Sequence, residues 1–256
     1  MDNTEVYDKF DWSKISYNFL KGKIDIILNL IPKDVKTIID IGCGNGVITN
    51  QLAKHYDVTG IDRSENALKT VETSKLVASA DSIPLGDYSF DMVFSSELLE
   101  HLDDDLLKGT VSEIKRLSNK YIFISVPNNE NPNKLSIGCP KCNYIYNSPN
   151  HLRNFNPEKL HALFSEYKLI KTITYGKKIR YYNNNILKLK IKLSPSKSWI
   201  PYFWMAKGKR KTTCPNCEHT FENSYKFNLF ATTCDLLNAV ISPKKPYWLF
   251  AIFEKV

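Results

Sequence analysis

The stretch Ile38-Ile39-Asp40-Ile41-Gly42-Cys43-Gly44-Asn45-Gly46 indicates the fold of this chain. Residues 37–41 form a short apolar run, typical of a buried parallel strand, and residues 47–55 have the apolar spacing of a helix. The alternate glycines between them let the backbone turn tightly and approach a ligand without an intervening Cβ. The helix after the turn would point free N–H groups at that ligand. The stretch therefore predicts a strand, a turn and a helix that form a nucleotide-type site.

Acidic residues stand at the ends of the predicted strands. There are three of them: Asp40 at the glycine turn, Asp62 after residues 58–61, and Asp81 after residues 76–80. In a dinucleotide fold, an acid about 20 residues beyond the first glycine accepts hydrogen bonds from ribose hydroxyls, and Asp62 has that spacing. Ligands of open α/β sheets bind at the carboxyl ends of the strands. We therefore expect the three acids to share one binding site.

With Asp40 ahead of a G-x-G-x-G turn, the chain resembles the class I S-adenosyl-L-methionine (SAM) methyltransferases, and its core is similar to the ubiquinone-pathway O-methyltransferases. The resemblance implies an α/β, Rossmann-like fold with a seven-stranded, mostly parallel sheet and an antiparallel last strand at residues 246–253. Strands four, five and six would lie at residues 90–96, 121–128 and 169–175. An amphipathic helix at residues 12–31 would pack ahead of the first strand.

The same resemblance assigns contacts to SAM. Asp62 would bind the ribose hydroxyls, Asp81 would bind the adenine amino group, and the stretch that starts at Ser82 would cover the adenine edge. The complete set of expected SAM-binding residues is Asp40, Gly42, Cys43, Gly44, Asn45, Gly46, Asp62, Arg63, Asp81, Ser82 and Ser96.

A glutamate- and histidine-rich stretch follows strand four. At helical spacing Glu97, Glu100 and His101 share one face near the expected methyl donor. The pattern resembles that of the small-RNA 3′-terminal ribose 2′-O-methyltransferases, in which two glutamates and two histidines bind a divalent ion. With His151 as the second histidine, the resemblance implies a Mg²⁺ or Mn²⁺ site made of Glu97, Glu100, His101 and His151.

A second interpretation of this stretch needs no metal. Glu97 and His101 would shape the pocket, with His101 as general base, and His151 would stabilise the loop ahead of a helix capped by Asn156 with Pro157 at its first position. The expected catalytic residues are His101, Glu97 and His151.

Two C-P-x-C knuckles stand 71 residues apart: Cys139-Pro140-Lys141-Cys142 and Cys214-Pro215-Asn216-Cys217. A two-residue gap lets both thiolates of a knuckle reach one ion, and two knuckles complete a tetrahedral zinc shell. Disulfides are the competing interpretation, but this spacing in a cytoplasmic chain favours a structural zinc ion. Cys43 and Cys234 are expected to be packing residues.

The net charge of +8 is concentrated in one region of the 256 residues. Residues 177–211 contain eleven Lys or Arg and no Asp or Glu, and within them residues 186–193 alternate apolar and basic side chains, which predicts a strand with one charged face. This region could contact an anionic membrane surface, RNA, or an acidic glycan or phosphorylated sugar, or it could be a solvated loop. We expect a methyltransferase core at residues 1–176 and 231–256. The basic, aromatic insertion at 177–230 would carry the second knuckle.

The sequence thus predicts a SAM-dependent methyltransferase whose acceptor is a hydroxyl of a small molecule, a glycan or a lipid-linked intermediate. Oxygen is favoured because residues 95–98 lack the Asn-Pro-Pro-Tyr type tetrad of amino-methylating DNA enzymes, and Val126-Pro127-Asn128 is common in O-methylating relatives. The alternatives are methylation of an RNA ribose or base, with the zinc-bearing insertion as the RNA grip, and a non-catalytic SAM-binding subunit. Without a long apolar segment or a signal-peptide pattern, we expect a cytoplasmic protein, either free or peripheral at a membrane.

Overall fold

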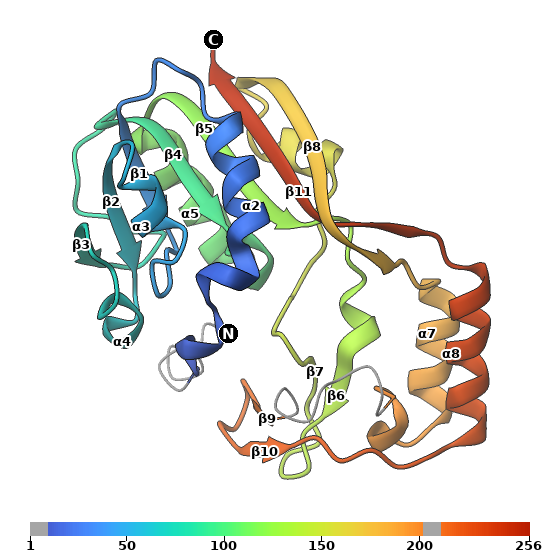
Figure 1. Cartoon of the computed structure of the whole chain (residues 1–256). Coiled ribbons are helices and arrows are strands. Elements are labelled where there is room, and N and C mark those ends of the chain that lie inside the picture. The colour runs from blue at the N-terminus through green and yellow to red at the C-terminus, as the bar shows by residue number, and fades with distance from the viewer. Residues whose placement is uncertain (1–9, 202–210) are drawn as a thin grey trace.

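A seven-stranded sheet forms the centre of the molecule (Figure 1). The structure, a computed structural model, describes residues 10–201 and 211–256. The strands lie in the order β3-β2-β1-β4-β5-β11-β8, in which β3, β2, β1, β4 and β5 pair in parallel and β11 runs antiparallel to both of its neighbours. Their bounds are β1 Thr37–Ile41, β2 Asp57–Asp62, β3 Ser74–Val77, β4 Phe90–Ser96, β5 Ser118–Pro127, β8 Tyr167–Arg180 and β11 Lys244–Lys255. The predicted Rossmann-like α/β class with an antiparallel last strand is confirmed.

Helices cover both faces of this sheet. Successive side chains of a strand point to opposite faces, so Ile38 packs with Ile27 of helix α2 while Ile39 packs with Ile114 of helix α5. Both faces of the parallel strands β1, β4 and β5 are therefore largely buried, as their apolar runs require. The helices of the core are α2 Tyr17–Leu30, α3 Thr49–Leu52, α4 Glu65–Leu68, α5 Asp104–Leu117 and α6 Pro157–Leu163, with short 3₁₀ turns η1 Trp12–Lys14, η2 Leu99–His101 and η3 Pro132–Leu135.

Helix α5 shows why these elements form where they do. Its N-cap residue Asp103 accepts a hydrogen bond from the backbone N–H of Leu106 (3.1 Å), which satisfies a free donor at the helix start. Acids occupy its first turn and Lys115 and Arg116 its last, an arrangement that complements the helix dipole. Its apolar stripe, which includes Ile114, is buried against the sheet.

Several predicted boundaries shift. The helix expected at 47–55 is helical only over α3, and the third strand ends at Val77, so Asp81 lies in the turn that follows. The segment 12–31 divides into η1 and α2. The expected helix cap at Asn156 is confirmed, since its side chain accepts from the N–H of Lys159 (2.8 Å) at the start of α6.

The predicted strand at 186–193 is wrong, because these residues form helix α7 (Asn184–Leu193). The side chain of Asn183 caps the helix by accepting from the N–H groups of Asn185 and Ile186 (3.0 and 3.3 Å). Leu187 and Lys190 are then one turn apart and both buried, although the alternation of leucine and lysine also fits a two-residue period. Tertiary contacts with helix α8 (Leu229–Ile241) favour the helical period over the strand period.

The segments that belong neither to the sheet nor to the helices on its faces form two small units. Both units lie at the end of the sheet away from the C-terminus (Figure 1). The hairpins β6 Ser136–Gly138 with β7 Ile145–Asn147, and β9 Lys211–Thr213 with β10 Thr220–Glu222, carry the two knuckles. Helices α7 and α8 (Leu229–Ile241) pack against each other, with η4 Ser196–Ser198 after α7. Residues 202–210 of the predicted basic segment lie outside the described residues. The division into domains stays a proposal, and the ends of β8 and β11 suggest an insertion at 181–243.

Candidate active site

The glycine turn after β1 adopts the predicted strained conformation. Gly42, Gly44 and Gly46 have φ angles of 76°, 54° and 73°, in the left-handed region that side chains disfavour. A Cβ at Gly44 would lie 2.6 Å from the ring of Trp12, and one at Gly42 would lie 2.9 Å from the side chain of Leu98. Only glycine fits these two positions, because both the backbone angle and the close neighbours exclude a side chain.

Asp62, at the end of β2, lies beside this turn. One carboxylate oxygen accepts from the N–H of Gly44 and the other from the N–H of Ser64, both at 2.9 Å. Asp40 is buried under the turn and accepts from the hydroxyl of Thr49 (2.7 Å). Burial raises the pKa of Asp40 to about 7, and the nearby Asp62 adds to the shift. Two of the three predicted acids therefore meet at one turn.

Two cavities meet at the glycine turn, with volumes of about 780 and 880 Å³. Both are lined by Trp12, Ile15, Gly42 and Glu97. Of the predicted SAM-binding residues, Asp62 and Arg63 line the first cavity. The second cavity is lined by five others: Asp40, Cys43, Gly44, Asn45 and Ser96. Gly46, Asp81 and Ser82 are not among the described residues that line either one.

The third acid, Asp81, packs behind the first cavity. The cavity wall there consists of Ala78, Ser79 and Ala80, and Asp81 accepts a hydrogen bond from the Ser79 hydroxyl. A Cβ at Gly109 would lie 2.6 Å from the Cβ of Asp81, so this glycine lets α5 approach the turn. A glycine inside helix α5 is the sequence feature that permits this close approach.

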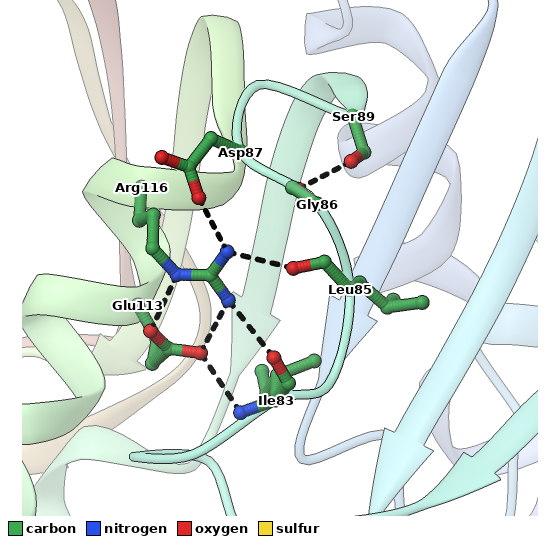
Figure 2. Close-up of polar contacts among 7 residues, drawn as sticks. All are labelled: Ile83, Leu85, Gly86, Asp87, Ser89, Glu113 and Arg116. Atoms are coloured by element: carbon green, nitrogen blue, oxygen red, sulfur yellow. Dashed lines mark hydrogen bonds and ion pairs between the residues drawn. The ribbon is translucent and has the colours of Figure 1, made fainter.

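The loop after Asp81 is fixed to α5 by a polar cluster around Arg116 (Figure 2). The Arg116 guanidinium donates to the carbonyls of Leu85 (2.7 Å) and Ile83 (2.9 Å) and to the carboxylates of Glu113 and Asp87. Glu113 also accepts from the N–H of Ile83 at 2.8 Å. The hydrogen bonds from Arg116 hold the pKa of Glu113 below its usual value. The loop beside the first cavity is therefore held by charge-assisted hydrogen bonds.

Glu97 occupies a different conformation from the predicted one. It has a φ of 56° and precedes the 3₁₀ turn η2, so no α-helix aligns it with Glu100 and His101. Instead Lys23 of α2 donates to Glu97 Oε1 (3.1 Å) and to the Ser96 hydroxyl (2.8 Å). Sequence reasoning missed Lys23, although a lysine on the apolar stripe of an amphipathic helix was a visible signal.

Glu100, His101 and His151 come together behind Glu97, with potential ligand atoms all within 4.8 Å of one another. Glu100 is 1% exposed, and neither of its carboxylate oxygens has a hydrogen-bond partner among the described residues. Burial raises the pKa of Glu100 to about 8 and lowers that of His101 to about 3. A buried carboxylate with two free oxygens next to two imidazoles has the donor set of a divalent-metal site.

The ring orientations of the two histidines favour the same interpretation. His151 Nδ1 contacts the carboxylate of Glu130, and His101 Nδ1 lies 3.3 Å from the carbonyl oxygen of Asn150. Each Nδ1 is thus directed at an oxygen acceptor, and His101 Nε2 lies 3.9 Å from Glu100 Oε1, an arrangement in which each Nε2 faces the cluster as in most histidine metal sites. Glu130 was not foreseen, because the loop between β5 and β6 carries no motif that marks it.

Comparison with known proteins agrees with this geometry. The family described as "Methyltransferase domain" matches residues 39–120, from β1 to the start of β5. The structure of a SAM-dependent methyltransferase from Archaeoglobus fulgidus is similar, with a TM-score of 0.58 and 19% identity over 94% of this chain and 96% of that one. Residues 39–120 thus match a methyltransferase domain family, and the chain has the fold of a SAM-dependent methyltransferase. The domain's glycine turn and strand-end acids are the features predicted from the sequence.

Two curated relatives each align with less than half of this chain. The ubiquinone biosynthesis O-methyltransferase of Hydrogenovibrio crunogenus is 32% identical over 93 residues, which is 32% of this chain and 39% of that protein. The ribosomal RNA small subunit methyltransferase C of Buchnera aphidicola is 27% identical over 120 residues, or 42% of this chain and 36% of that one. The chain thus spans well under two thirds of the length of these two relatives.

The four knuckle cysteines gather beside the methyltransferase domain. Cys139 Sγ lies 3.6 Å from Cys217 Sγ, and Cys142 Sγ lies 3.7 Å from Cys214 Sγ. These separations are close to the edge of about 3.8 Å that a zinc tetrahedron with bonds of about 2.3 Å requires, and far from a disulfide bond of about 2 Å. All four thiols are within 4.8 Å of one another, so the cluster fits a zinc ion.

The two knuckles have matching backbones. Asn143 and Glu218 follow the second cysteine of each knuckle with φ angles of 58° and 57°. The N–H of Asn143 donates to Cys139 O (3.0 Å), and that of Glu218 donates to Cys214 O (2.9 Å). The second knuckle therefore reaches the required turn even with a glutamate in the left-handed position.

The cysteine-bearing hairpins also form part of the first cavity. Its wall opposite Asp62 includes Ser148, Pro149 and Asn150 from the first hairpin region, and Lys211, Thr212, Thr213 and Thr220 from the second. The cavity is therefore enclosed by the methyltransferase domain on one side and by these hairpins on the other.

Proposed function

We propose that the protein binds SAM across the glycine turn and transfers its methyl group to a hydroxyl of a small molecule, a glycan or a lipid-linked intermediate. The observation that carries the proposal is the first cavity. Its walls combine the glycine turn and Asp62 with His101, at the edge of the Glu100–His101–His151 cluster. The residues that would bind the cofactor and the residues suited to acid–base or metal chemistry thus line the same cavity.

SAM fits the two cavities as an extended ligand that crosses Gly42. Asp62 would bind the ribose hydroxyls, and the turn at Ser79–Ser82, with Asp81 behind it, would hold the adenine. Asp40, Gly44 and Ser96 line the second cavity, where the methionine portion would lie. Bound SAM supplies an activated methyl group on its sulfonium, so the protein must orient the acceptor in line and remove its proton.

The cluster behind Glu97 is suited to an oxygen acceptor. Glu100, His101 and His151 would hold a divalent ion such as Mn²⁺ or Mg²⁺, which lowers the pKa of a coordinated hydroxyl. Without an ion, His101, which lines the first cavity, would be the general base; burial keeps its imidazole neutral but also lowers its pKa, which weakens it as a base. Glu130 would be a positioning residue that orients His151.

RNA is the second candidate acceptor. Lys211 and three threonines in the cavity wall offer contacts to phosphate and ribose, and one curated relative is named as a ribosomal RNA methyltransferase. Binding of RNA with a steep salt dependence would favour this acceptor over a small molecule.

We also propose that Cys139, Cys142, Cys214 and Cys217 hold one structural zinc ion. Zinc would join two segments 71 residues apart and fix the cavity wall formed by the two hairpins. Metal analysis should find about one zinc per chain, lost in Cys139→Ser and kept in Cys234→Ser, since Cys234 lies in α8. Reduced, folded protein without zinc would refute this assignment.

The decisive experiment for the cofactor is calorimetric titration with S-adenosylhomocysteine. Wild-type protein should bind it, and Asp62→Ala should lose the affinity by about 100-fold or more because a charged hydrogen-bond acceptor is removed. Asp57→Ala is the matched control, since Asp57 is an exposed residue at the other end of β2. Equal affinity of the two variants would refute the ribose assignment.

The metal assignment is tested by titrating Mn²⁺ alone into zinc-loaded protein and following its paramagnetic resonance. Glu100→Gln and His151→Ala should abolish the binding, and Glu130→Gln should weaken it by about 10- to 100-fold. Glu158→Gln is the control, because Glu158 is exposed at the start of α6. Absence of Mn²⁺ binding in the wild type would leave His101 as a metal-free base.

A further inference from the structure

Helix α8 carries its apolar side chains on the outside of the protein. Leu229, Leu236 and Val240 are 72%, 62% and 82% exposed, and helical spacing places them on one face. Leu237 and Ile241 extend this face and are also more than half exposed, at 51% and 57%. An ordinary surface helix directs such a stripe at the core. We call Leu229, Leu236, Leu237, Val240 and Ile241 the outer face of α8.

The side of α8 that faces α7 is polar. Asp235 forms an ion pair with Lys190 of α7 (2.5 Å), and the two side chains are 5% and 1% exposed. Asn238, also buried, accepts a hydrogen bond from the N–H of Asn183, the N-cap residue of α7 (2.8 Å). Turning α8 to bury its leucines would break both contacts and leave buried charges unpaired, which costs more than the exposed leucines. The helix is therefore fixed with its outer face toward the surroundings.

The hairpin that carries this outer face has exposed cations and no exposed acid. In residues 177–201 and 223–245 of the sequence, Asp235 is the only acid, and it is buried. Exposed lysines stand on α7 at Lys188 and Lys192 and directly after α8 at Lys244 and Lys245. α7 also exposes Leu189 and Leu193, at 47% and 57%. The surface of the α7–α8 hairpin is thus apolar and positively charged.

We propose that the α7–α8 hairpin docks on an anionic lipid surface, with the outer face of α8 in the boundary between headgroups and acyl chains. Apolar side chains with flanking lysines are the chemistry that such a surface binds. α8 has 13 residues, fewer than the roughly 20 that span a bilayer. No helix in residues 10–201 and 211–256 is long and apolar enough to cross a membrane. The hairpin would therefore lie in the interface.

Lipid fits this hairpin better than nucleic acid does. The exposed side chains of the outer face are leucine, isoleucine and valine, which cannot stack on bases as aromatic side chains do. The lysines around them are point charges suited to diffuse attraction by lipid headgroups. This surface also includes α8, beyond the basic segment 177–211 that the sequence marked.

The test is flotation of the full-length, zinc-loaded protein with vesicles. Wild-type protein should float with vesicles of equal parts phosphatidylglycerol and phosphatidylcholine, and remain unbound with phosphatidylcholine alone. Raising the salt concentration should weaken the binding. The double variant Leu236→Asp, Val240→Asp should lose about tenfold or more of the bound fraction. Ile170→Asp is the matched control, since Ile170 is an exposed aliphatic residue of the edge strand β8.

A second pair of variants separates charge from apolar insertion. Lys188→Gln with Lys192→Gln should weaken flotation, whereas Lys168→Gln with Lys171→Gln, which removes the same charge from β8, should leave it unchanged. Affinity for S-adenosylhomocysteine should be equal in all variants, which reports an intact fold. This readout is independent of vesicle binding, so failure of the cofactor proposal would be seen separately.

Three results would overturn the proposal. The first is absence of flotation with anionic vesicles, and the second is equal flotation of the Leu236→Asp, Val240→Asp variant. The third is light scattering that shows a dimer of the wild type and a monomer of this variant, because a second copy of the chain would then cover the outer face. The proposal is supported if flotation is lost in the Leu236→Asp, Val240→Asp variant and weakened in the Lys188→Gln, Lys192→Gln variant, while the control variants on β8 float like the wild type.

Discussion

Helices α5 and α8 are nearly equal in length, at 14 and 13 residues, but opposite in polarity. α5 buries leucine, valine and isoleucine against the sheet and leaves its charged residues exposed or half-buried. α8 buries Asp235 and Asn238 and exposes its leucines. The difference shows that the orientation of α5 is set by the protein core, whereas that of α8 is set by its polar contact with α7, which leaves the apolar side of α8 exposed.

The core and the α7–α8 hairpin each contain a buried aspartate, and the two aspartates have different partners. In the core, Asp40 is held by the hydroxyl of Thr49, and burial raises its pKa to about 7. In the hairpin, Asp235 contacts the ammonium group of Lys190 directly. Asp40 is therefore about half protonated near pH 7, while Asp235 forms half of an ion pair.

The largest expected effect tests the contrast between the two helices. Ile114→Asp places a carboxylate at a fully buried position of α5 and should cost more than about 5 kcal/mol, enough to prevent folding. Val240→Asp on α8 should change the free energy of unfolding by less than about 0.5 kcal/mol, because its side chain is 82% exposed. Soluble yield and urea unfolding measure both. Comparable losses in the two variants would contradict the orientation of α8.

The second prediction concerns the polar interior of the hairpin. Asp235→Ala should lower the free energy of unfolding by about 3–5 kcal/mol, because it leaves the Lys190 ammonium buried and unpaired. The double variant Lys190→Met, Asp235→Leu should recover most of that loss, since it removes both charges. Denaturant midpoints of the three proteins give the comparison, and a double variant no better than Asp235→Ala would argue against a buried pair.

The third prediction uses the raised pKa of Asp40. Below pH of about 4 the carboxyl is protonated in both folded and unfolded chains, so it has no effect on stability. As the pH rises to about 7, the unfolded chain loses this proton while the folded chain keeps it, so wild-type stability falls and then levels off. Asp40→Asn should therefore gain about 1–4 kcal/mol over wild type between these limits.

Melting temperatures of the wild type and Asp40→Asn at several pH values measure this difference. The advantage of the variant should grow with pH and stay constant above pH of about 7. Asp91→Asn is a useful comparison, because Asp91 accepts hydrogen bonds from the N–H groups of Lys36 and Thr37 at the opposite end of the sheet. An advantage that shrinks as the pH rises would show that Asp40 is ionised in the folded protein.

The smallest expected effect lies in the Arg116 cluster (Figure 2). Asp87→Asn removes an exposed ion-pair partner and should cost no more than about 0.5 kcal/mol. Glu113→Gln should cost about 1–2 kcal/mol, because Glu113 also accepts from the N–H of Ile83. Chemical denaturation of both variants ranks the two contacts, and a larger loss from Asp87→Asn would reverse our account of the loop.

Patterns among residues close together in the sequence predicted most of the fold and half of the site. Positive φ angles need glycine, so the turn at Gly42–Gly46 was visible in the sequence, and strand-end acids followed from the register of buried strands. The paired cysteines were visible because their spacing within each knuckle is fixed by one turn of backbone. These features depend on residues close together in the chain.

Long-range contacts account for what was missed. Lys23 meets Glu97 across 74 positions and Glu130 meets His151 across 21, so neither partner could be paired from spacing. The alternating leucines and lysines of α7 fitted a strand until the contact of Lys190 with Asp235, 45 positions away, selected the helix. Side-chain partners of this kind are set by packing, which the linear pattern does not encode.

The sequence by itself determined the methyltransferase fold, the glycine turn, the acids Asp40 and Asp62 and the two cysteine knuckles, because each follows from local backbone geometry and hydrophobic periodicity. Only the tertiary structure decided that Glu97 pairs with Lys23, and that α8 turns its leucines outward. The physical reason is the cost of burying polar groups. Buried charges need an oppositely charged partner, which can be far away in the sequence. Exposed apolar patches are typical of sites that contact another molecule.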